Sequence, residues 1–426
     1  MSSAGTLKTM NATRGVPHRL ALALLALAAF VAYAPSLTIP LLEDDYPNLL
    51  LSQQLGPPSE LAALFHNPVF RLRATSLWIM YGLWHLAKLT PWVYRLGNLF
   101  LHIANTWLLY GICLAWPRMR AAALWAAAFF AVAEGHQEAV MWFSAINELL
   151  QFLFGMGALW CWLRDRGWWT QVLGWALFAL ALLSKESAVV FLPLLLLTDF
   201  RRPWRLIPYL ALAALAIASV VGSRDTSFRF SDGSFSLQAP FWVTWPESYA
   251  RLLWIWGVAA IPAILLAMDR ALTRAALAAA VWIGISLAPY SFLTYSTRIP
   301  SRQTYLASAG LAMLVGLAAA YWQARAGARR TAVVAVAAVV LLHNVLYLWT
   351  KKRRQFVIRA TPTEQLIAFA RRTPGPIWIQ CFPRNHYIAE EAVHLGAGHE
   401  ASDLIWDEAE AKRLAAATFC YNGPQP

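Results

Sequence analysis

Three consecutive acids, Glu43-Asp44-Asp45, lie directly after the first long apolar run of the sequence, residues 18–42. A charged side chain in contact with lipid is costly, so acids at the end of a membrane segment usually face water or protein. A carboxylate in such a place can act as a general base or as a metal ligand. The alternative is a helix end followed by a solvated turn. We take Asp44 and Asp45 as the candidate catalytic residues.

A polar stripe interrupts the apolar run around residue 100. Asn98, His102 and Asn105 are spaced four and three residues apart, which places them on one face of a helix. Such a face must contact protein rather than lipid, and there it either binds neighbouring helices or contacts a substrate. A metal site is less favoured, because no second histidine follows at ligand spacing on the same helix.

Ionisable residues also lie at the ends of two later apolar runs. Glu138 is followed at once by apolar residues, which favours a position facing the helix bundle. Lys185 and Glu186 separate two apolar runs. The lysine either binds a phosphate or pairs with the glutamate beside it.

Two arginines precede the apolar run near residue 313. Arg298 and Arg302 bracket Ile299-Pro300-Ser301, and Tyr305 continues onto the helix that follows. An arginine at the start of a helix combines a guanidinium group with free backbone N–H groups, and both suit an anionic headgroup. The alternative is an arginine at the membrane surface that reaches lipid phosphates.

The elements that must position these residues are membrane helices. Of the 426 residues, 59% are hydrophobic and 13% are charged, and the apolar residues form blocks separated by short basic loops. About 20 mostly apolar residues are needed to cross a bilayer as a helix. The sequence therefore predicts an all-α polytopic membrane protein with about eleven transmembrane helices, centred near residues 30, 104, 127, 154, 176, 191, 212, 258, 284, 313 and 340.

The net charge of +13 would suggest nucleic acid as a partner of a soluble protein. Here the basic residues fall mostly in alternate short loops, which is how membrane proteins encode their orientation. We therefore expect no nucleic-acid partner, a multi-pass protein of the inner (cytoplasmic) membrane, a cytoplasmic amino terminus and outward-facing acids. The first apolar run is too long for the core of a cleavable signal peptide.

Two regions outside the helix bundle are expected. Residues 43–91 alternate turn signals with short amphipathic patterns, which suits helices lying on the outer surface of a membrane domain formed by residues 1–350. Residues 351–426 form a small α+β carboxy-terminal region, with a strand-like segment at 376–382 between helical patterns at 363–372 and 402–417. We expect this region outside, although it begins with four basic residues. A disulfide between Cys381 and Cys420 is left open.

Outer carboxylates and outer cations on separate helices suit a phosphate-linked substrate that arrives within the membrane. The sequence has no Walker loop, dinucleotide fingerprint or nucleophile elbow, so chemistry on soluble nucleotides is not supported.

The order and spacing of these motifs carry a resemblance that covers residues 20–350. The matching pieces are Asp44-Asp45, Phe70-Arg71, Asn98 with His102 and Asn105, Glu138-Ala139-Val140 with Trp142, Leu183-Ser184-Lys185-Glu186, and Ser301-Arg302 with Tyr305-Leu306 and Ser308. The chain resembles the GT-C superfamily of polytopic glycosyltransferases, and within it the transmembrane part of the O-mannosyltransferases that carry tetratricopeptide repeats, together with their bacterial relatives.

The sequence also departs from that family pattern. The repeats themselves are missing, and Leu72 stands where a proline is usual. Ala133-Glu134 replaces a common His-Pro, and Ala145-Ile146-Asn147-Glu148 replaces Gly-Arg-x-Asp. These changes leave the sugar and the acceptor undefined.

The resemblance implies a donor that is a polyprenyl-phosphate sugar and an acceptor hydroxyl on a glycan, lipid or protein. In this hypothesis Asp44 is the base of an inverting transfer at the outer face, and Asp45 or Glu138 orients it or holds a divalent cation. No other cofactor is expected. Lys185, Arg298 and Arg302 would bind the donor phosphate, with support from Asn98, His102, Glu186 and Tyr305. The alternatives are a transporter or flippase of a lipid-linked sugar and a non-catalytic envelope assembly protein.

Overall fold

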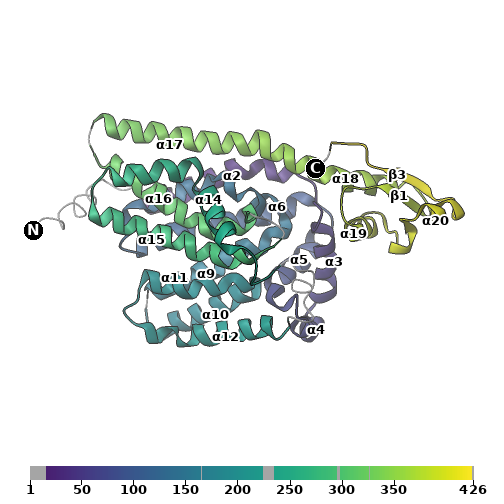
Figure 1. The fold of residues 1–426 in the computed structure, drawn as a ribbon, viewed down its shortest axis with the longest axis horizontal. Helices are drawn as coiled ribbons and strands as arrows, with labels where there is room; N and C mark the ends of the chain where they lie inside the picture. Colours follow the sequence, from purple (N-terminus) through teal and green to yellow (C-terminus); the bar gives the residue numbers. More distant parts are fainter. Residues whose placement is uncertain (1–15, 165, 224–234, 295–297, 326, 425–426) are drawn as a thin grey trace, which may run out of the picture.

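The structure is a computed structural model, and it describes residues 16–164, 166–223, 235–294, 298–325 and 327–424. Most of the chain forms a bundle of helices, and a small sheet lies near the carboxyl terminus (Figure 1). The all-α membrane fold with a small appendage is confirmed.

Each of the eleven predicted centres lies in an apolar helix. The helices are α2 (His18–Tyr33), α6 (Pro91–Ala115), α7 (Ala123–Val132), α9 (Ile146–Arg164), α10 (Trp168–Ser184), α11 (Phe191–Thr198), α12 (Ile207–Val221), α14 (Phe241–Leu265), α15 (Arg270–Leu287), α16 (Tyr305–Gln323) and α17 (Ala328–Tyr347). In the described ranges, eight helical stretches are long and apolar enough to cross a membrane, and those at α7, α10 and α11 are shorter. The number of crossings stays a prediction.

Burial separates the centre of the bundle from its periphery. α16 has the most buried apolar window of these stretches, at 83%, whereas the window that covers α17 is only 11% buried. α16 packs against α7, α14 and α15, and α9 packs against α6 and α10. The residues that precede α16 are therefore fixed by the most enclosed helix of the bundle.

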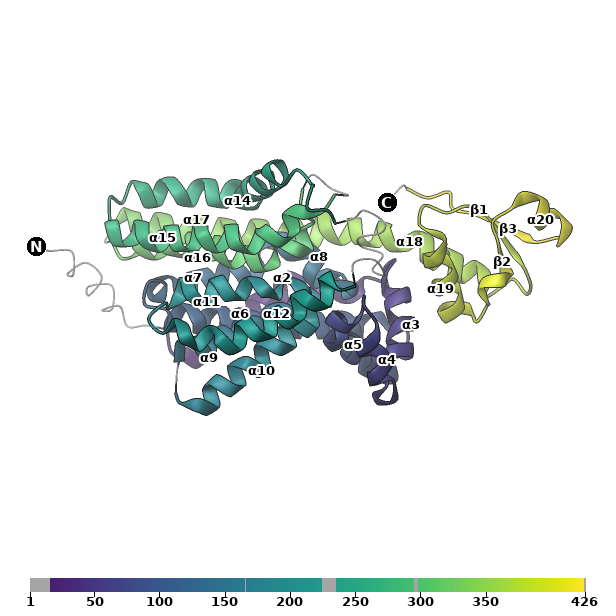
Figure 2. The same ribbon diagram turned by 60° about the horizontal axis from the view of Figure 1, so that its bottom comes forward.

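Three short helices, which follow α2 and precede α6 in the sequence, cover one end of the bundle. They are α3 (Asp45–Leu55), α4 (Leu61–His66) and α5 (Ala74–Ala87). Figure 2 shows them at the same end as the carboxy-terminal region. α5 packs against α6, α9 and α10, so it is a layer over the bundle rather than a separate domain. The sequence predicted short helices in this segment, and they are present.

A long helical rod connects the bundle to the carboxy-terminal region. α17 continues through a π-helical turn, Leu348–Lys352, into α18 (Arg353–Ala370) (Figure 1). The basic run that begins this region therefore lies within a continuous helix and does not form a loop. The rod carries the chain to the end of the bundle where the three acids lie.

The carboxy-terminal region contains a three-stranded parallel sheet. β1 (Ile377–Cys381) is central and pairs with β2 (Leu404–Ile405) and β3 (Ala417–Cys420). α19 (His386–Ala397) and α20 (Glu408–Arg413) connect the strands, which allows the parallel pairing. Cys381 and Cys420 form a disulfide between β1 and β3.

One expectation for this region is wrong. The helix expected at residues 402–417 is only α20, and strands β2 and β3 occupy its two ends. The apolar pair Leu404-Ile405 joins the sheet, and Asp407 then starts the helix by accepting a hydrogen bond from the backbone N–H of Glu410 at 2.8 Å.

Candidate functional site

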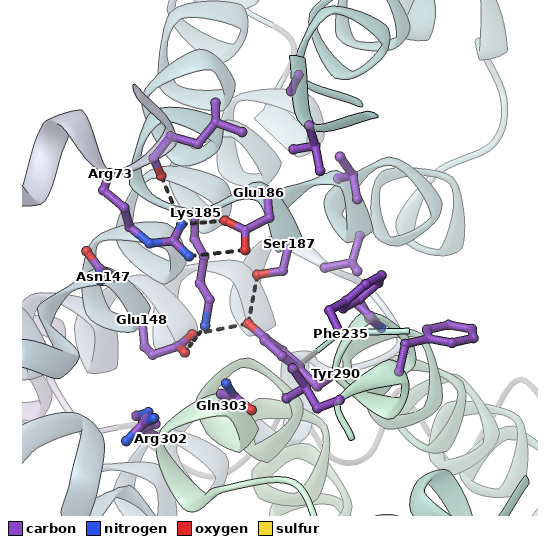
Figure 3. A pocket seen from close by; sticks show the side chains of 18 of the residues that line it. Arg73, Asn147, Glu148, Lys185, Glu186, Ser187, Phe235, Tyr290, Arg302 and Gln303 are labelled. Carbon is purple, nitrogen blue, oxygen red and sulfur yellow. Dashed lines mark hydrogen bonds and ion pairs between the residues drawn. The ribbon is translucent and has the colours of Figure 1, made fainter. Parts of the chain in front are cut away.

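A cavity of about 1190 Å³ opens at the end of the bundle covered by α3 and α5. Its polar lining includes Asp44, Arg73, Asn147, Glu148, Lys185, Glu186, Tyr290 and Arg302. Its apolar lining comes from the ends of α11, α12 and α15 and includes Pro193, Ile217, Val220 and Ile285. Residues that are far apart in the sequence thus share one wall (Figure 3).

Asp44 precedes the first residue of α3 and lines the cavity with its side chain only partly buried. Burial raises the pKa of Asp44, and the nearby positive charge of Arg302 opposes that rise. The neighbouring acids Glu43 and Asp45 raise the pKa of Asp44 further. A carboxylate with a raised pKa is a stronger base, and the guanidinium helps to keep it ionised.

Asp45 is fully buried behind Asp44 and does not line the cavity. Its Oδ2 accepts hydrogen bonds from the guanidinium of Arg95 at 3.1 Å and from the backbone N–H of Leu42 at 2.8 Å. Its Oδ1 accepts from the backbone N–H and the hydroxyl of Ser144, at 2.9 and 2.7 Å. Both carboxylate oxygens therefore hold the turn that presents Asp44.

Two ion pairs line the cavity and balance two of its cations. Lys185 pairs with Glu148, and the hydroxyl of Tyr290 donates to the other oxygen of Glu148 at 3.2 Å. Arg73 donates to both oxygens of Glu186, at 2.5 and 3.1 Å (Figure 3). Lys185 and Glu186 are neighbours in sequence, but each pairs with a residue from another element. The Lys185–Glu186 pair weighed from the sequence is not the one that forms.

Arg302 reaches the same cavity from a short 3-10 turn, Ser301–Thr304, that leads into α16. Its guanidinium lies 4.7 Å from the ring centre of Trp142, and its backbone N–H donates to Glu138 at 3.1 Å. Among the described residues, no carboxylate lies within ion-pair distance of this guanidinium. Its charge acts on Asp44 without a direct ion pair, so the guanidinium can still bind an anion.

Arg298 is placed differently from Arg302. It is more than half exposed, pairs with Glu247 at 3.6 Å and is not part of the cavity lining. Its predicted role in phosphate binding gains no support from this geometry and stays a prediction.

The polar stripe on α6 lies in the buried interior. The amide of Asn98 donates to the carbonyl of Trp142 at 3.0 Å, and that of Asn105 donates to the carbonyl of Leu149 at 3.0 Å. The ring nitrogens of His102 bond the hydroxyl of Tyr305 at 2.7 Å and the carbonyl of Ala131 at 3.0 Å. The stripe thus joins α6 to the segments that carry Trp142 and Arg302. The hydrogen bonds to neighbouring segments that the sequence allowed are present, and a role of Asn98 and His102 toward the substrate stays a prediction.

A divalent cation stays a prediction. Within the described ranges, no three His, Cys, Asp or Glu side chains are grouped as metal ligands. Glu43 and Asp45, which flank Asp44, are each already paired with arginine.

Comparison with known proteins identifies the fold. No protein-family profile matches the chain. It is 29% identical over 247 residues to the protein O-mannosyl-transferase Tmtc1 of Drosophila melanogaster, a match that covers 55% of this chain and 27% of the fly protein. The oligosaccharyltransferase of Archaeoglobus fulgidus superposes with a TM-score of 0.56 and 12% identity, over 93% of this chain and 65% of that one. ArnT of Cupriavidus metallidurans, bound to undecaprenyl phosphate, superposes with a TM-score of 0.54 and 13% identity, over 95% and 90% of the two chains. The chain has the GT-C fold.

The GT-C fold extends over nearly the whole chain, whereas the chain spans only about a quarter of the fly relative that it matches. The resemblance inferred from the motifs is confirmed at the level of the fold. Sequence reasoning missed Arg73 as a partner in the cavity, because nothing near it in the sequence indicates which carboxylate it meets. It also missed three carboxy-terminal residues near the acids, Arg359, Arg384 and Tyr387, which lie more than 300 residues from the acids in the sequence.

Proposed function

We propose that the protein transfers a sugar from a polyprenyl-phosphate donor to an acceptor hydroxyl. The observation that carries the proposal is that Asp44 and Arg302 line one cavity while the charges of Lys185 and Arg73 are balanced by Glu148 and Glu186. An ionisable base and a cation that forms no ion pair among the described residues are the two groups that this reaction needs.

The donor would contact both the apolar and the polar parts of the cavity lining. The apolar wall from α11, α12 and α15 suits a polyprenyl chain, and the guanidinium of Arg302 suits the phosphodiester. Structures with the same fold hold undecaprenyl phosphate, in ArnT, and dolichol-phosphate, in AglB, the oligosaccharyltransferase of Archaeoglobus fulgidus, which supports a lipid phosphate as the ligand.

The transfer needs one base. Asp44 takes the proton of the acceptor hydroxyl while the hydroxyl oxygen forms a bond to the anomeric carbon. The bond from that carbon to the phosphate oxygen breaks, and its electron pair stays on the phosphate, where Arg302 stabilises the added negative charge. Attack from the face opposite the phosphate inverts the anomeric centre.

The outer face of the cytoplasmic membrane is the proposed place of the reaction. The connections between α11 and α12 and between α16 and α17 lie at the end of the bundle opposite the carboxy-terminal region (Figure 1). These connections and the first turn of α17 together carry six arginines: Arg201, Arg202, Arg205, Arg325, Arg329 and Arg330. The positive-inside rule puts that end in the cytoplasm and the cavity on the other side.

The test is a transfer assay on the full chain reconstituted in liposomes, where the two leaflets face separate compartments. Undecaprenyl-phosphate mannose, glucose and galactose, each labelled in the sugar, are supplied with an envelope extract as the source of acceptor. We expect label to leave the lipid fraction with one donor, and Asp44→Asn to abolish this release while undecaprenyl phosphate still binds. Turnover that survives substitution of Asp44 would remove it as the base, and movement of the intact donor across the bilayer without release would favour a flippase.

A further inference from the structure

The carboxy-terminal region is docked on the turn that contains the three acids. Arg359 of α18 and Arg384, which precedes α19, both pair with Glu43, at 2.8 and 2.7 Å. The hydroxyl of Tyr46 donates to Glu364 of α18 at 3.0 Å. Below these polar contacts, Tyr46 and Leu49 share an apolar cluster with Ile367 and Ala392. The interface thus has an apolar base and two arginines on a single carboxylate.

The turn itself has an unusual backbone. Glu43 has φ of 24°, in the left-handed region that L-residues with a side chain rarely adopt. Such a conformation persists only when the surroundings hold it in place. Here Arg359 and Arg384 hold Glu43 from one side, and the bonds of Asp45 hold the turn from the other. Asp44, between them, is left to face the cavity.

Tyr387, in the first turn of α19, reaches Asp44 directly. Its hydroxyl lies 3.4 Å from Oδ1 of Asp44 and donates to it, and the tyrosine is 46% exposed. We propose that Tyr387 is a positioning residue for Asp44, so that the carboxy-terminal region forms part of the active site. This inference rests on the proposed role of Asp44 as the base.

The ionisation of Asp44 depends on five groups. Arg302 and Tyr387 lower its pKa, and its neighbours Glu43 and Asp45 raise it. Arg384 also lies close enough to interact with its charge. Tyr387→Phe removes the hydroxyl that donates a hydrogen bond to the ionised carboxylate of Asp44. The pKa of Asp44 should therefore rise in that variant.

The test measures that ionisation without requiring turnover. The full chain, labelled with ¹³C at aspartate carboxyl carbons, is titrated in nanodiscs by NMR, and the Asp44 signal is assigned by its loss in Asp44→Asn. We expect the midpoint of Asp44 to move up by about half a pH unit in Tyr387→Phe, since a weak hydrogen bond to a charged group has about that effect. An unchanged midpoint would overturn the proposal.

Tyr46→Phe is the matched control. It also removes one hydroxyl from the interface between the acidic turn and the carboxy-terminal region, but that hydroxyl contacts Glu364 and not Asp44. We expect the midpoint of Asp44 to stay where it is. An equal shift in both variants would mean that loosened docking, not the Tyr387 hydroxyl, changes Asp44, and would overturn the proposal.

A parallel pH–rate profile separates this inference from the proposed function. With the donor that turns over among the three undecaprenyl-phosphate sugars, the acid limb should move to higher pH in Tyr387→Phe. Loss of turnover in Asp44→Asn with no movement of the limb in Tyr387→Phe would reject only the role of Tyr387. Turnover that persists in Asp44→Asn would reject Asp44 as the base, and the inference with it.

Discussion

The cavity wall and the buried layer behind it use polar side chains in opposite ways. In the buried layer, Asp45 accepts four hydrogen bonds, and the stripe on α6 donates to backbone carbonyls. In the wall, Asp44 is only partly buried and Arg302 has no carboxylate partner among the described residues. Two adjacent aspartates therefore differ in their surroundings: Asp45 has both carboxylate oxygens hydrogen-bonded in the interior, and Asp44 faces the cavity. Each variant below is expected to affect either turnover or stability.

The largest effect on turnover is expected from a substitution in the cavity wall. Asp44→Asn should reduce sugar transfer by about 10²-fold or more, because a positioned base contributes about that much to the rate. The measurement is initial release of labelled sugar from the lipid donor. Asp45→Asn, measured at a temperature where it stays folded, is the control, and a loss as large in that variant would mean that this comparison does not separate the base from the turn that holds it.

Arg302→Met should weaken binding of undecaprenyl phosphate by about tenfold or more, because it removes a charge-assisted contact. Binding is measured by native mass spectrometry of the protein in nanodiscs. Arg298→Met is the matched control, since Arg298 lies outside the cavity lining. An equal loss in the control would support Arg298 as a second phosphate contact, as the sequence suggested.

The buried layer should respond through stability. Asp45→Asn breaks a fully buried ion pair with Arg95 and should cost about 3 kcal/mol or more of unfolding free energy. Equilibrium unfolding in detergent measures it. Replacing both partners, in Asp45→Asn with Arg95→Met, should recover part of the loss. A single variant as stable as the unsubstituted protein would contradict the role assigned to Asp45.

A smaller loss is expected from the polar stripe. Asn98→Ala removes a hydrogen bond between helices and should cost about 1 kcal/mol, the usual value inside membrane bundles. Transfer at a permissive temperature should remain close to normal. A loss of turnover with unchanged stability would indicate that Asn98 contacts the substrate and does not only connect helices.

The smallest expected effect is a gain in stability rather than a loss. Because burial raises the pKa of Asp44, the folded state binds its proton more tightly than the unfolded chain. The stability that comes from the protonated form is present at low pH and is lost as pH rises through the raised pKa. Asp44→Asn should therefore be slightly more stable than the unsubstituted protein at neutral pH, and the difference should shrink on acidification. A difference that grows on acidification would contradict a raised pKa.

Much of this fold is readable from the sequence, for specific reasons. Apolar blocks of spanning length give the positions of the helices, and a spacing of four and three residues gives the buried face of α6. Asp44 and Arg302 are found because each charge stands beside an apolar run. The pairs Lys185–Glu148 and Arg73–Glu186 could not be predicted, since a break after α10 sends adjacent side chains to different partners. Tyr387 carried no signal at all, because only the docking of α19 on α3 brings it to Asp44.

The helical rod of α17 and α18 connects the bundle to the turn that contains the three acids. The apolar window that covers α17 is only 11% buried, and α18 carries Arg359, which pairs with Glu43. Helices adjust their inclination to the thickness of the surrounding bilayer. A change in the inclination of α17 would therefore be passed through the π-helical turn to Arg359 and its ion pair with Glu43, the residue that precedes Asp44.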